Sequence, residues 1–406
     1  MNEKVIMAED FKSLFFKFKD NLISLKIFVQ NVAPIVSKID KDFMEKLDNF
    51  LNKVKKDKVG DQDKNKKYEI NLSKEEAKEI MDLFVKRPFL SEPQILLLNK
   101  SSFVMLISYF DFLISDIIRY FYKKFSLSLN NKDLYITLSD LKVCENIEEA
   151  LKIVINKEVE KILYDSLKKQ LKYFKDVLCV DVQSDTVDWI KINEAVERRN
   201  IIVHNDSVIN KRYLESIDDE IIQNKKDDYE IGKKIRLKSS YFQDIYDELY
   251  LAAFIIHHLC WRKWEKENIE EQDSFLISET YEALKNEKWF LAERIGCFSK
   301  NIKNIINDLN RSMLNVNYLQ ALKWQNKKDI FDEELKKIDF SAKGPIFQLV
   351  YCALIDDEET FFKNIEKAIN SESMEKNYFF EWPIFKEFRK NPKYLDIVEN
   401  AYSRCS

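Results

Sequence analysis

The spacing of hydrophobic residues along the chain predicts a protein made of amphipathic helices. Apolar residues recur three or four positions apart over most of the sequence, which lines them up on one face of a helix. Pro34 separates the first two expected helices, and Ser73 with Glu76 has the spacing of a capping box at the start of the third. Up to residue 270 we therefore expect helices over 9–31, 40–56, 74–86, 97–126, 146–178, 186–204 and 241–266.

Two stretches of this part lack the helical pattern. Residues 53–69 are rich in lysine and contain Gly60, which is typical of a solvated loop. Residues 216–240 are charged and irregular, and we expect a short extended piece within them at KKIRLK.

From about residue 271 the pattern changes to short helices spaced like helical hairpins. The stretch 353–369 predicts a helix, a tight polar turn and a second helix, and it resembles a tetratricopeptide-like hairpin. Because no fixed period connects the hairpins, a plain helical bundle is the alternative. The expected helices are 274–286, 289–299, 302–326, 343–355, 358–369 and 375–389. We divide the chain into an N-terminal helical region (1–95), a central helical domain (96–268) and a C-terminal hairpin region (269–406).

The amino-acid composition limits the fold classes and the functions that are possible for this chain. Of the 406 residues only four are glycine and six are proline. Sheet-rich folds and phosphate-binding loops depend on glycine, so the scarcity favours an all-α fold, and neither GxGxxG nor GxxxxGK[ST] is present. The net charge is −4, with 66 basic and 70 acidic residues intermixed. Such a chain is not expected to coat nucleic acid, so any RNA would be held by a local site.

We expect a cytoplasmic protein with no metal and no cofactor. The N-terminus lacks the layout of a signal peptide, and no uninterrupted apolar run approaches the length of a membrane span. The adjacent His257 and His258 point about 100° apart on a helix and are expected to be ordinary bundle residues. The six cysteines are far apart, as free thiols are, with no spacing of a disulfide framework or zinc site: Cys144, Cys179, Cys260, Cys297, Cys352 and Cys405.

The helix expected at 186–204 has an arginine at the centre of its apolar side. A buried guanidinium without a partner costs several kcal/mol, and arginine does not lose its proton inside a protein. Arg199 therefore needs a fixed acid, a cleft or an anionic ligand. The apolar residues that surround it on the helical projection are Trp189, Ile192, Ala195, Val196, Ile202 and Val203.

Two further polar residues accompany Arg199. Asn200 and His204 lie four positions apart, so they share one flank of the helix, with Glu197 nearby. The polar turn at 205–207 is expected to leave the imidazole near a helix end, where a substrate can reach it.

Asp111 is a second isolated charge, on the helix expected at 97–126. Opposite buried charges are usually paired, so we expect Asp111 and Arg199 to share one polar site. Whether that carboxylate is a structural partner or a catalytic group stays open. Its neighbours on the same face are Val104, Ile107, Ile114 and Ile118.

These residues resemble the HEPN domain family (higher eukaryotes and prokaryotes nucleotide-binding). The segment ERRNIIVHND (197–206) is similar to the arginine–histidine motif of that family, in which asparagine often follows the arginine. The segments 101–122 and 232–259 are similar to the first and last helices of one branch. The resemblance covers about 97–266 and leaves out 1–95 and 270–406.

The resemblance implies an all-α bundle, a homodimer that brings two motifs together, and a metal-independent RNA endonuclease. It maps the family's catalytic residues to Arg199, Asn200 and His204, with Asp111 as a looser, supporting match. RNA would be cleaved by its own 2′-hydroxyl to a 2′,3′-cyclic phosphate, in a toxin or antiphage defence setting. The alternative is a noncatalytic RNA-binding or assembly subunit. The C-terminal hairpins would engage another protein, a regulatory one in the case of the endonuclease, and the alternative is that they merely extend the fold.

Overall fold

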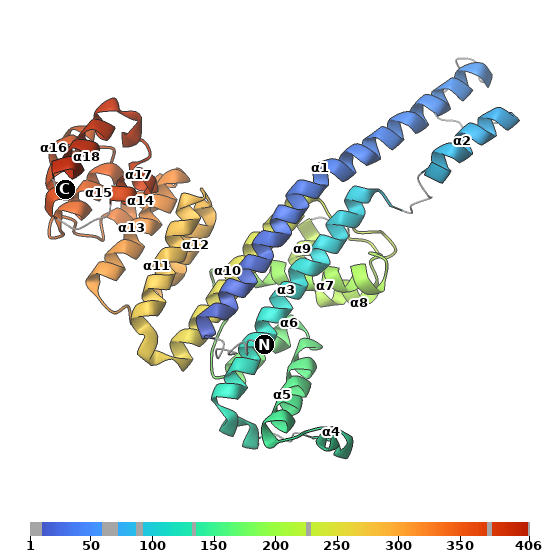
Figure 1. Cartoon of the computed structure of the whole chain (residues 1–406), viewed down its shortest axis with the longest axis horizontal. Helices are drawn as coiled ribbons and strands as arrows, with labels where there is room; N and C mark the ends of the chain where they lie inside the picture. Colours follow the sequence, from blue (N-terminus) through green and yellow to red (C-terminus); the bar gives the residue numbers. More distant parts are fainter. Residues whose placement is uncertain are drawn as a thin grey trace, which may run out of the picture. The chain divides into compact units, whose positions relative to one another are not determined.

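A computed structural model describes residues 10–58, 72–86, 92–131, 135–224, 229–371 and 376–404. Within these ranges the protein is all-α, with 18 α-helices and no sheet, as the sequence predicted (Figure 1). One isolated antiparallel bridge joins Val208 to Lys234, inside the predicted extended piece KKIRLK. The chain forms two compact units, Met1–Leu178 with Asp188–Ala253, and Cys179–Val187 with Phe254–Ser406. The predicted boundaries at 95/96 and 268/269 do not coincide with these units.

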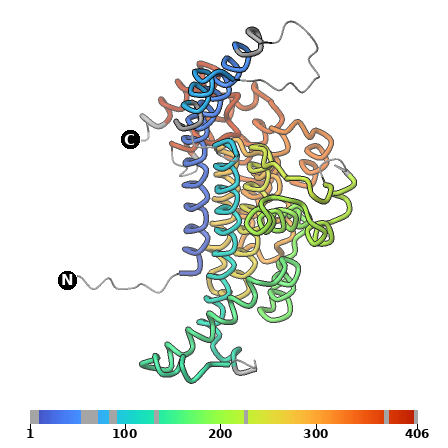
Figure 2. Tube along the Cα trace, turned by 90° about the vertical axis from the view of Figure 1, so that its right-hand side faces the viewer, coloured from blue at the N-terminus to red at the C-terminus, as the bar shows by residue number. Residues whose placement is uncertain are grey.

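The first unit contains the helices that carry the predicted site. Its longest helices, α1 and α3, run side by side in opposite directions (Figure 1 and Figure 2). The helices of this unit are α1 (Phe11–Lys58), α2 (Lys74–Lys86), α3 (Gln94–Lys124), α4 (Leu138–Lys142), α5 (Ile147–Leu163), α6 (Leu167–Asp176), α7 (Trp189–His204), α8 (Lys211–Ser216), α9 (Asp219–Asn224) and the first part of α10 (Ser239–Trp264), with the 3₁₀ turn Ser126–Asn131.

Contacts at both ends of α3 hold α1 against it. Near the end of α3, the rings of Phe11 and Tyr120 lie 4.7 Å apart. At its start, Pro93 provides no side-chain cap, and Asp40 of α1 instead accepts hydrogen bonds from the backbone N–H groups of residues 94 and 95, at 3.0 and 2.9 Å. A carboxylate there satisfies orphan donors and the positive end of the helix dipole. The N-terminal region therefore folds with the central helices rather than apart from them.

The prediction of two helices divided at Pro34 is wrong, because α1 continues through this proline. A proline inside a helix removes one hydrogen bond and strains the preceding turn. Here the helix is held on both sides of the proline: Leu22 and Leu25 are buried before it, and Phe50 is buried after it. The capping box at Ser73 is confirmed. The expected loop at 53–69 starts later than predicted, because α1 runs to Lys58, and residues 59–71 lie outside the described ranges.

Two helices have the length and apolar composition of membrane spans, whereas the sequence predicted no apolar run of that length. In α3 most of the apolar window is buried inside the protein, as in an ordinary core helix. In α1 only 11% of the window is buried, and Ile27, Phe28 and Ile35 are exposed on its surface. Length and composition alone do not distinguish a span from a core or surface helix, and nothing in the structure shows a membrane.

The second unit contains three helical hairpins with one shared turn geometry. Residues 286–288, 325–327 and 355–357 connect the paired helices, and the middle residue of each turn is left-handed, with φ of 57°, 57° and 59°. This confirms the helix–turn–helix predicted for 353–369. The pairs are α11 (Ile269–Lys285) with α12 (Trp289–Lys300), α13 (Asp308–Trp324) with α14 (Lys328–Leu335), and α15 (Pro345–Leu354) with α16 (Glu358–Ser371).

The C-terminal end of this unit departs from the expected single helix at 375–389. Helix α17 (Lys376–Glu381) stops before Pro383, which has no N–H to continue it, and two 3₁₀ turns follow at Pro383–Phe385 and Phe388–Lys390. Helix α18 (Pro392–Arg404), like α14, was not predicted. The last helices close over a core of aromatic rings that includes Phe361, Phe379, Phe385, Phe388 and Tyr394.

The first two hairpins meet at a glycine. A Cβ added at Gly296 of α12 would lie 2.7 Å from Cδ2 and 2.9 Å from Cβ of Tyr318 in α13. Such distances are below van der Waals contact, and a Cβ atom cannot move aside without its backbone. Gly296 therefore sets how closely α12 and α13 approach.

We predict that Gly296→Ala destabilises the protein by about 1–3 kcal/mol, the usual range for overpacking. Helix propensity alone predicts the opposite sign, a gain of about 1 kcal/mol for alanine over glycine inside a helix. Urea unfolding followed by circular dichroism measures the difference. A variant as stable as the wild type, or more stable, would show that the close approach of α12 and α13 is not constrained by this residue.

Candidate active site

The four residues predicted for the site line one cavity of the first unit. It has a volume of about 420 Å³, within the size range of ligand pockets, and α3, α7, the α5–α6 turn and the segment that leads into α8 form its walls. Asp111 enters from α3, whereas Arg199, Asn200 and His204 enter from α7. The structure thus brings together, from two helices far apart in sequence, the residues that the sequence singled out.

Arg199 and Asp111 form an ion pair in the wall of this cavity. The guanidinium Nη2 donates to Oδ2 of the carboxylate at 2.8 Å, which confirms the expected pairing. The two side chains remain 24% and 22% exposed, so the pair is accessible from the cavity. Nε of the arginine is buried without a hydrogen-bond partner among the described residues. The guanidinium is therefore only partly engaged by protein groups.

Burial changes the acidity of the Asp111 carboxyl. Its removal from water raises the pKa from 3.8 to about 6, although the nearby Arg199 guanidinium acts in the opposite direction. Desolvation penalises the charged carboxylate more than one partly exposed ion pair recovers. Asp111 is thus a carboxyl whose charge changes not far below neutral pH.

His204 is the last residue of α7 and is exposed. The chain turns sharply after it, because Asp206 and Ser207 are both left-handed, with φ of 48° and 64°. The Ser207 N–H closes the turn on the carbonyl of Ile201 at 3.0 Å. The imidazole is therefore displayed at a helix end, as the sequence predicted.

Asn200 lies between the arginine and the imidazole. Its Nδ2 donates to Oε2 of Glu197 at 3.3 Å, so a residue of the same helix orients the amide. Glu197 also lines the cavity. Among the residues that the structure describes, no three His, Cys, Asp or Glu side chains are grouped to hold a metal ion.

The buried guanidinium of α7 is Arg198, not Arg199, and this corrects the sequence interpretation. Val203, assigned to the apolar side around Arg199, is 51% exposed, whereas Ile201 on another side of the helix is buried. The core face of α7 is thus rotated relative to the predicted stripe, with which it shares Ile192 and Ala195, and Arg199 lies at its edge. The residues of α7 that are buried are Ile192, Glu194, Ala195, Arg198 and Ile201.

A polar network holds Arg198 inside the core. Its Nε donates to Glu194 at 2.7 Å, and its Nη2 donates to the Tyr229 hydroxyl at 2.8 Å. The hydroxyls of Tyr213 and Tyr241 donate to the same carboxylate, and the guanidinium stacks on the Tyr241 ring at 4.0 Å. Burial of a charge is tolerated only with such partners. The spacing of Glu194 and Arg198, four residues apart, was a signal that the sequence reading missed.

The sequence reading also missed the far wall of the cavity. Tyr164, Asp165 and Ser166 in the turn between α5 and α6 line it, as do Asn210 and Arg212 at the start of α8. Nothing in the local sequence connects these residues to Arg199, because tertiary packing brings them together.

His257 and His258 lie outside this cavity, fully buried in the second unit. The ring of His258 stacks on Phe254 at 5.7 Å and meets Phe298 edge-on. Burial holds the pKa of His258 well below its usual value, with smaller contributions from Arg262 and His257. Their burial agrees with the prediction that they are bundle residues.

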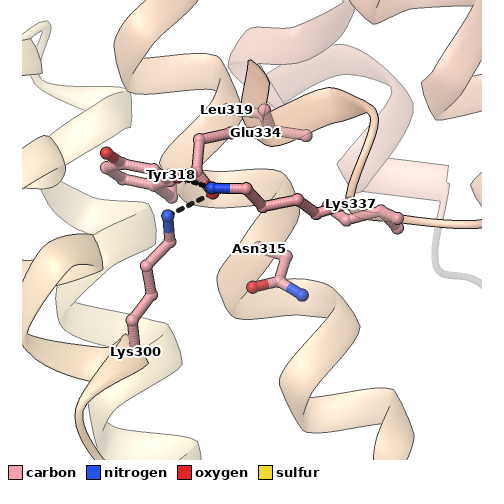
Figure 3. A pocket seen from close by; sticks show the side chains of 7 residues that line it. Lys300, Asn315, Tyr318, Leu319, Glu334 and Lys337 are labelled. Atoms are coloured by element: carbon pink, nitrogen blue, oxygen red, sulfur yellow. Dashed lines mark hydrogen bonds and ion pairs between the residues drawn. The ribbon is translucent and has the colours of Figure 1, made fainter. Parts of the chain in front are cut away.

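A second cavity, of about 320 Å³, lies in the second unit among α12, α13 and α14 (Figure 3). Lys300 and Lys337 both pair with Glu334 there, and Lys300 lies 3.9 Å above the Tyr318 ring. Burial would raise the pKa of Glu334, but hydrogen bonds from the two lysines hold it below its usual value. Both lysines of this cavity are already engaged by the one carboxylate of Glu334, so it is a weaker candidate for chemistry than the first.

Comparisons with models of protein families, with curated proteins and with solved structures found no match. The interpretation of the site therefore depends on its own geometry and chemistry.

We predict that Asp111 lowers the stability of the protein above pH 6, relative to Asp111→Asn. The folded carboxyl binds a proton with a pKa of about 6, whereas its ordinary value is 3.8, so the folded state holds more protons between these values. The free energy of unfolding of the wild type, minus that of the variant, should fall by about 1–3 kcal/mol as pH rises from 4 to 6.5. Urea titrations at several pH values measure this, and a difference that does not change with pH would contradict it.

Proposed function

We propose that the chain is a HEPN-type RNA endonuclease that works without a metal ion. The observation that carries this proposal is the single cavity in which Arg199, Asn200 and His204 stand together, with Asp111 beside them. A phosphate-binding cation, an amide and an exposed imidazole are the groups that cleavage of RNA by its own 2′-hydroxyl needs. The resemblance of 197–206 to the HEPN motif points to the same reaction.

In this reaction a base removes the proton of the 2′-hydroxyl, and the oxygen bonds to the adjacent phosphorus. The bond from phosphorus to the 5′-oxygen breaks, and that oxygen takes up a proton, which leaves a 2′,3′-cyclic phosphate and a 5′-hydroxyl. His204 serves as the base or as the acid. Arg199 stabilises the negative charge that builds on the phosphate oxygens, and Asn200 orients the phosphate or the ribose. A homodimer would supply a second motif to the same reaction.

Asp111 has a positioning role in this proposal. It holds one terminal nitrogen of the Arg199 guanidinium at 2.8 Å, while the side chain keeps about a quarter of its surface exposed. The carboxylate thus fixes the direction of the guanidinium before substrate arrives. The incoming phosphate then either shares the guanidinium with Asp111 or displaces it.

The setting that we propose for this activity is that of a toxin or antiphage defence effector. The hairpins of the second unit would bind a protein that controls when RNA is cut. This part of the proposal depends on the HEPN resemblance and on the three hairpins, since stacked helical hairpins often present binding surfaces.

One observation favours a second function, in which the protein binds RNA or a partner without cutting. The Arg199 guanidinium already has a carboxylate partner, as it would in a domain whose catalytic role has been lost. In that case His204→Ala would keep the biological phenotype. Substitution of exposed residues between 343 and 389, such as Tyr351 and Tyr378, would abolish it.

For the endonuclease, we predict that His204→Ala and Arg199→Ala each reduce RNA cleavage by at least about 100-fold, the usual range for loss of an acid–base group or of a charge-stabilising donor. Total RNA is incubated with the full chain in EDTA, and the products are tested for 2′,3′-cyclic ends. Lys211→Ala is the control, because Lys211 is an exposed cation near the site that does not line the cavity.

Circular dichroism of each variant checks that the fold is kept. Equal cleavage by the wild type and both site variants would remove these residues from the reaction. Absence of cleavage by the wild type, even with its controlling protein supplied, would favour the noncatalytic function instead.

A further inference from the structure

The rim of the cavity carries an aromatic side chain that the proposed chemistry does not use. Tyr164 is 91% exposed, yet it lines the same cavity as Arg199 and His204. It lies in the turn between α5 and α6, on the wall contributed by a different part of the chain from α7. An aromatic ring so open to solvent gains little from the fold, and beside the cavity its face is available for stacking.

The turn that presents this ring is well fixed. The Tyr164 N–H donates to the carbonyl of Glu160 at 3.1 Å, which ends α5, and the Asp165 N–H donates to Ile162 at 3.1 Å. Gln170 is buried, with 6% of its surface exposed, and its amide donates to the carbonyl of Asp165 at 3.1 Å. The same amide also donates to the carbonyl of Leu163 at 3.5 Å, so this buried side chain holds the backbone on both sides of the tyrosine. The ring is displayed by a rigid turn and not by a loose loop.

The rest of the cavity has the chemistry of a nucleotide site. Asn205, Asn210 and Arg212 add amide and guanidinium groups of the kind that hydrogen-bond base edges and phosphates. A base stacked on an aromatic ring gains affinity whatever its identity, since every base has a π-face. An exposed ring beside polar groups and a phosphate-binding arginine therefore matches an unpaired nucleotide better than it matches a peptide or a lipid.

We propose that Tyr164 is the stacking platform for one unpaired base of a single-stranded RNA, next to the phosphate held by Arg199. The inference rests on the proposed function in that both place RNA in this cavity. It adds a residue and a substrate class, because a base inside a duplex has both faces covered by its neighbours. Single-stranded RNA is then bound in preference to the same sequence in a duplex.

The test uses a short 2′-O-methyl oligoribonucleotide that contains 2-aminopurine, whose fluorescence falls when the base stacks. The methyl group blocks 2′-hydroxyl attack, so binding is measured without cleavage. We expect the full-length wild type to quench the fluorescence on binding. Tyr164→Ala should lose the quenching and bind about 10-fold more weakly, whereas Tyr164→Phe keeps both because it keeps the ring.

Tyr135→Ala is the matched control, because Tyr135 is 83% exposed in the same unit but does not line the cavity. The wild type should bind the single strand at least about 10-fold more tightly than the same strand in a duplex. Unchanged quenching and affinity in Tyr164→Ala, equal affinity for the duplex, or no binding by the wild type would each overturn the inference.

Cleavage of unmodified RNA, measured separately, distinguishes this inference from the proposed function. Tyr164-dependent binding without any cleavage supports the stacking platform and rejects the endonuclease. Cleavage that depends on His204 but is indifferent to Tyr164→Ala, together with unchanged quenching, rejects the platform and leaves the endonuclease in place.

Discussion

An ion pair between two helices organises the cavity on which the proposed function depends. Asp111 of α3 and Arg199 of α7 meet at 2.8 Å, each about a quarter exposed. A fully buried pair would act only as a structural link, and a fully exposed one would contribute little and hold no geometry. At this intermediate depth the carboxylate directs the guanidinium, while the cavity remains open to an anion. Burial raises the pKa of Asp111 despite the nearby guanidinium, so the ion pair does not fully offset the cost of desolvating the carboxylate.

The direction of Arg199 is set by the residue before it. Consecutive residues on a helix point about 100° apart, so a side chain fixed in the core determines where its neighbour points. Arg198 is fixed by Glu194, by the Tyr229 hydroxyl and by the Tyr241 ring. The hydroxyls of Tyr213 and Tyr241 in turn hold the Glu194 carboxylate. This network anchors the rotation of α7 and leaves Arg199, Asn200 and His204 along the cavity side. Two adjacent arginines thus have separate tasks, one in folding and one at the site.

Sequence periodicity predicted what depends on local chemistry. The capping box at Ser73, the helix end after His204 and the tight turn within 353–369 follow from residue types at fixed spacing, and all three are present. The pattern gave wrong predictions where tertiary contacts determine which residues are buried and where a helix ends. The pattern predicted a buried charge at Arg199 because periodicity carries no information on the tyrosines that hold Arg198. It predicted two helices divided at Pro34 because it carries no information on the contacts of α3 with α1 on both sides of this proline. The α5–α6 turn was missed for the same reason, since only packing brings Tyr164 to the cavity.

The charges of the cavity constrain how an RNA could be held there. Arg199 and Arg212 are opposed by three acids that line the same walls, Asp111, Asp165 and Glu197. Because the acidic and basic residues that line the cavity are nearly equal in number, they can neutralise few phosphates. The net charge of −4 adds no general attraction of the protein for RNA. Binding by counterion release would therefore be weak and would depend little on salt. For an RNA bound as we propose, affinity would then come mainly from contacts that do not need charge, namely stacking on Tyr164 and hydrogen bonds to amides, in addition to the one phosphate at Arg199.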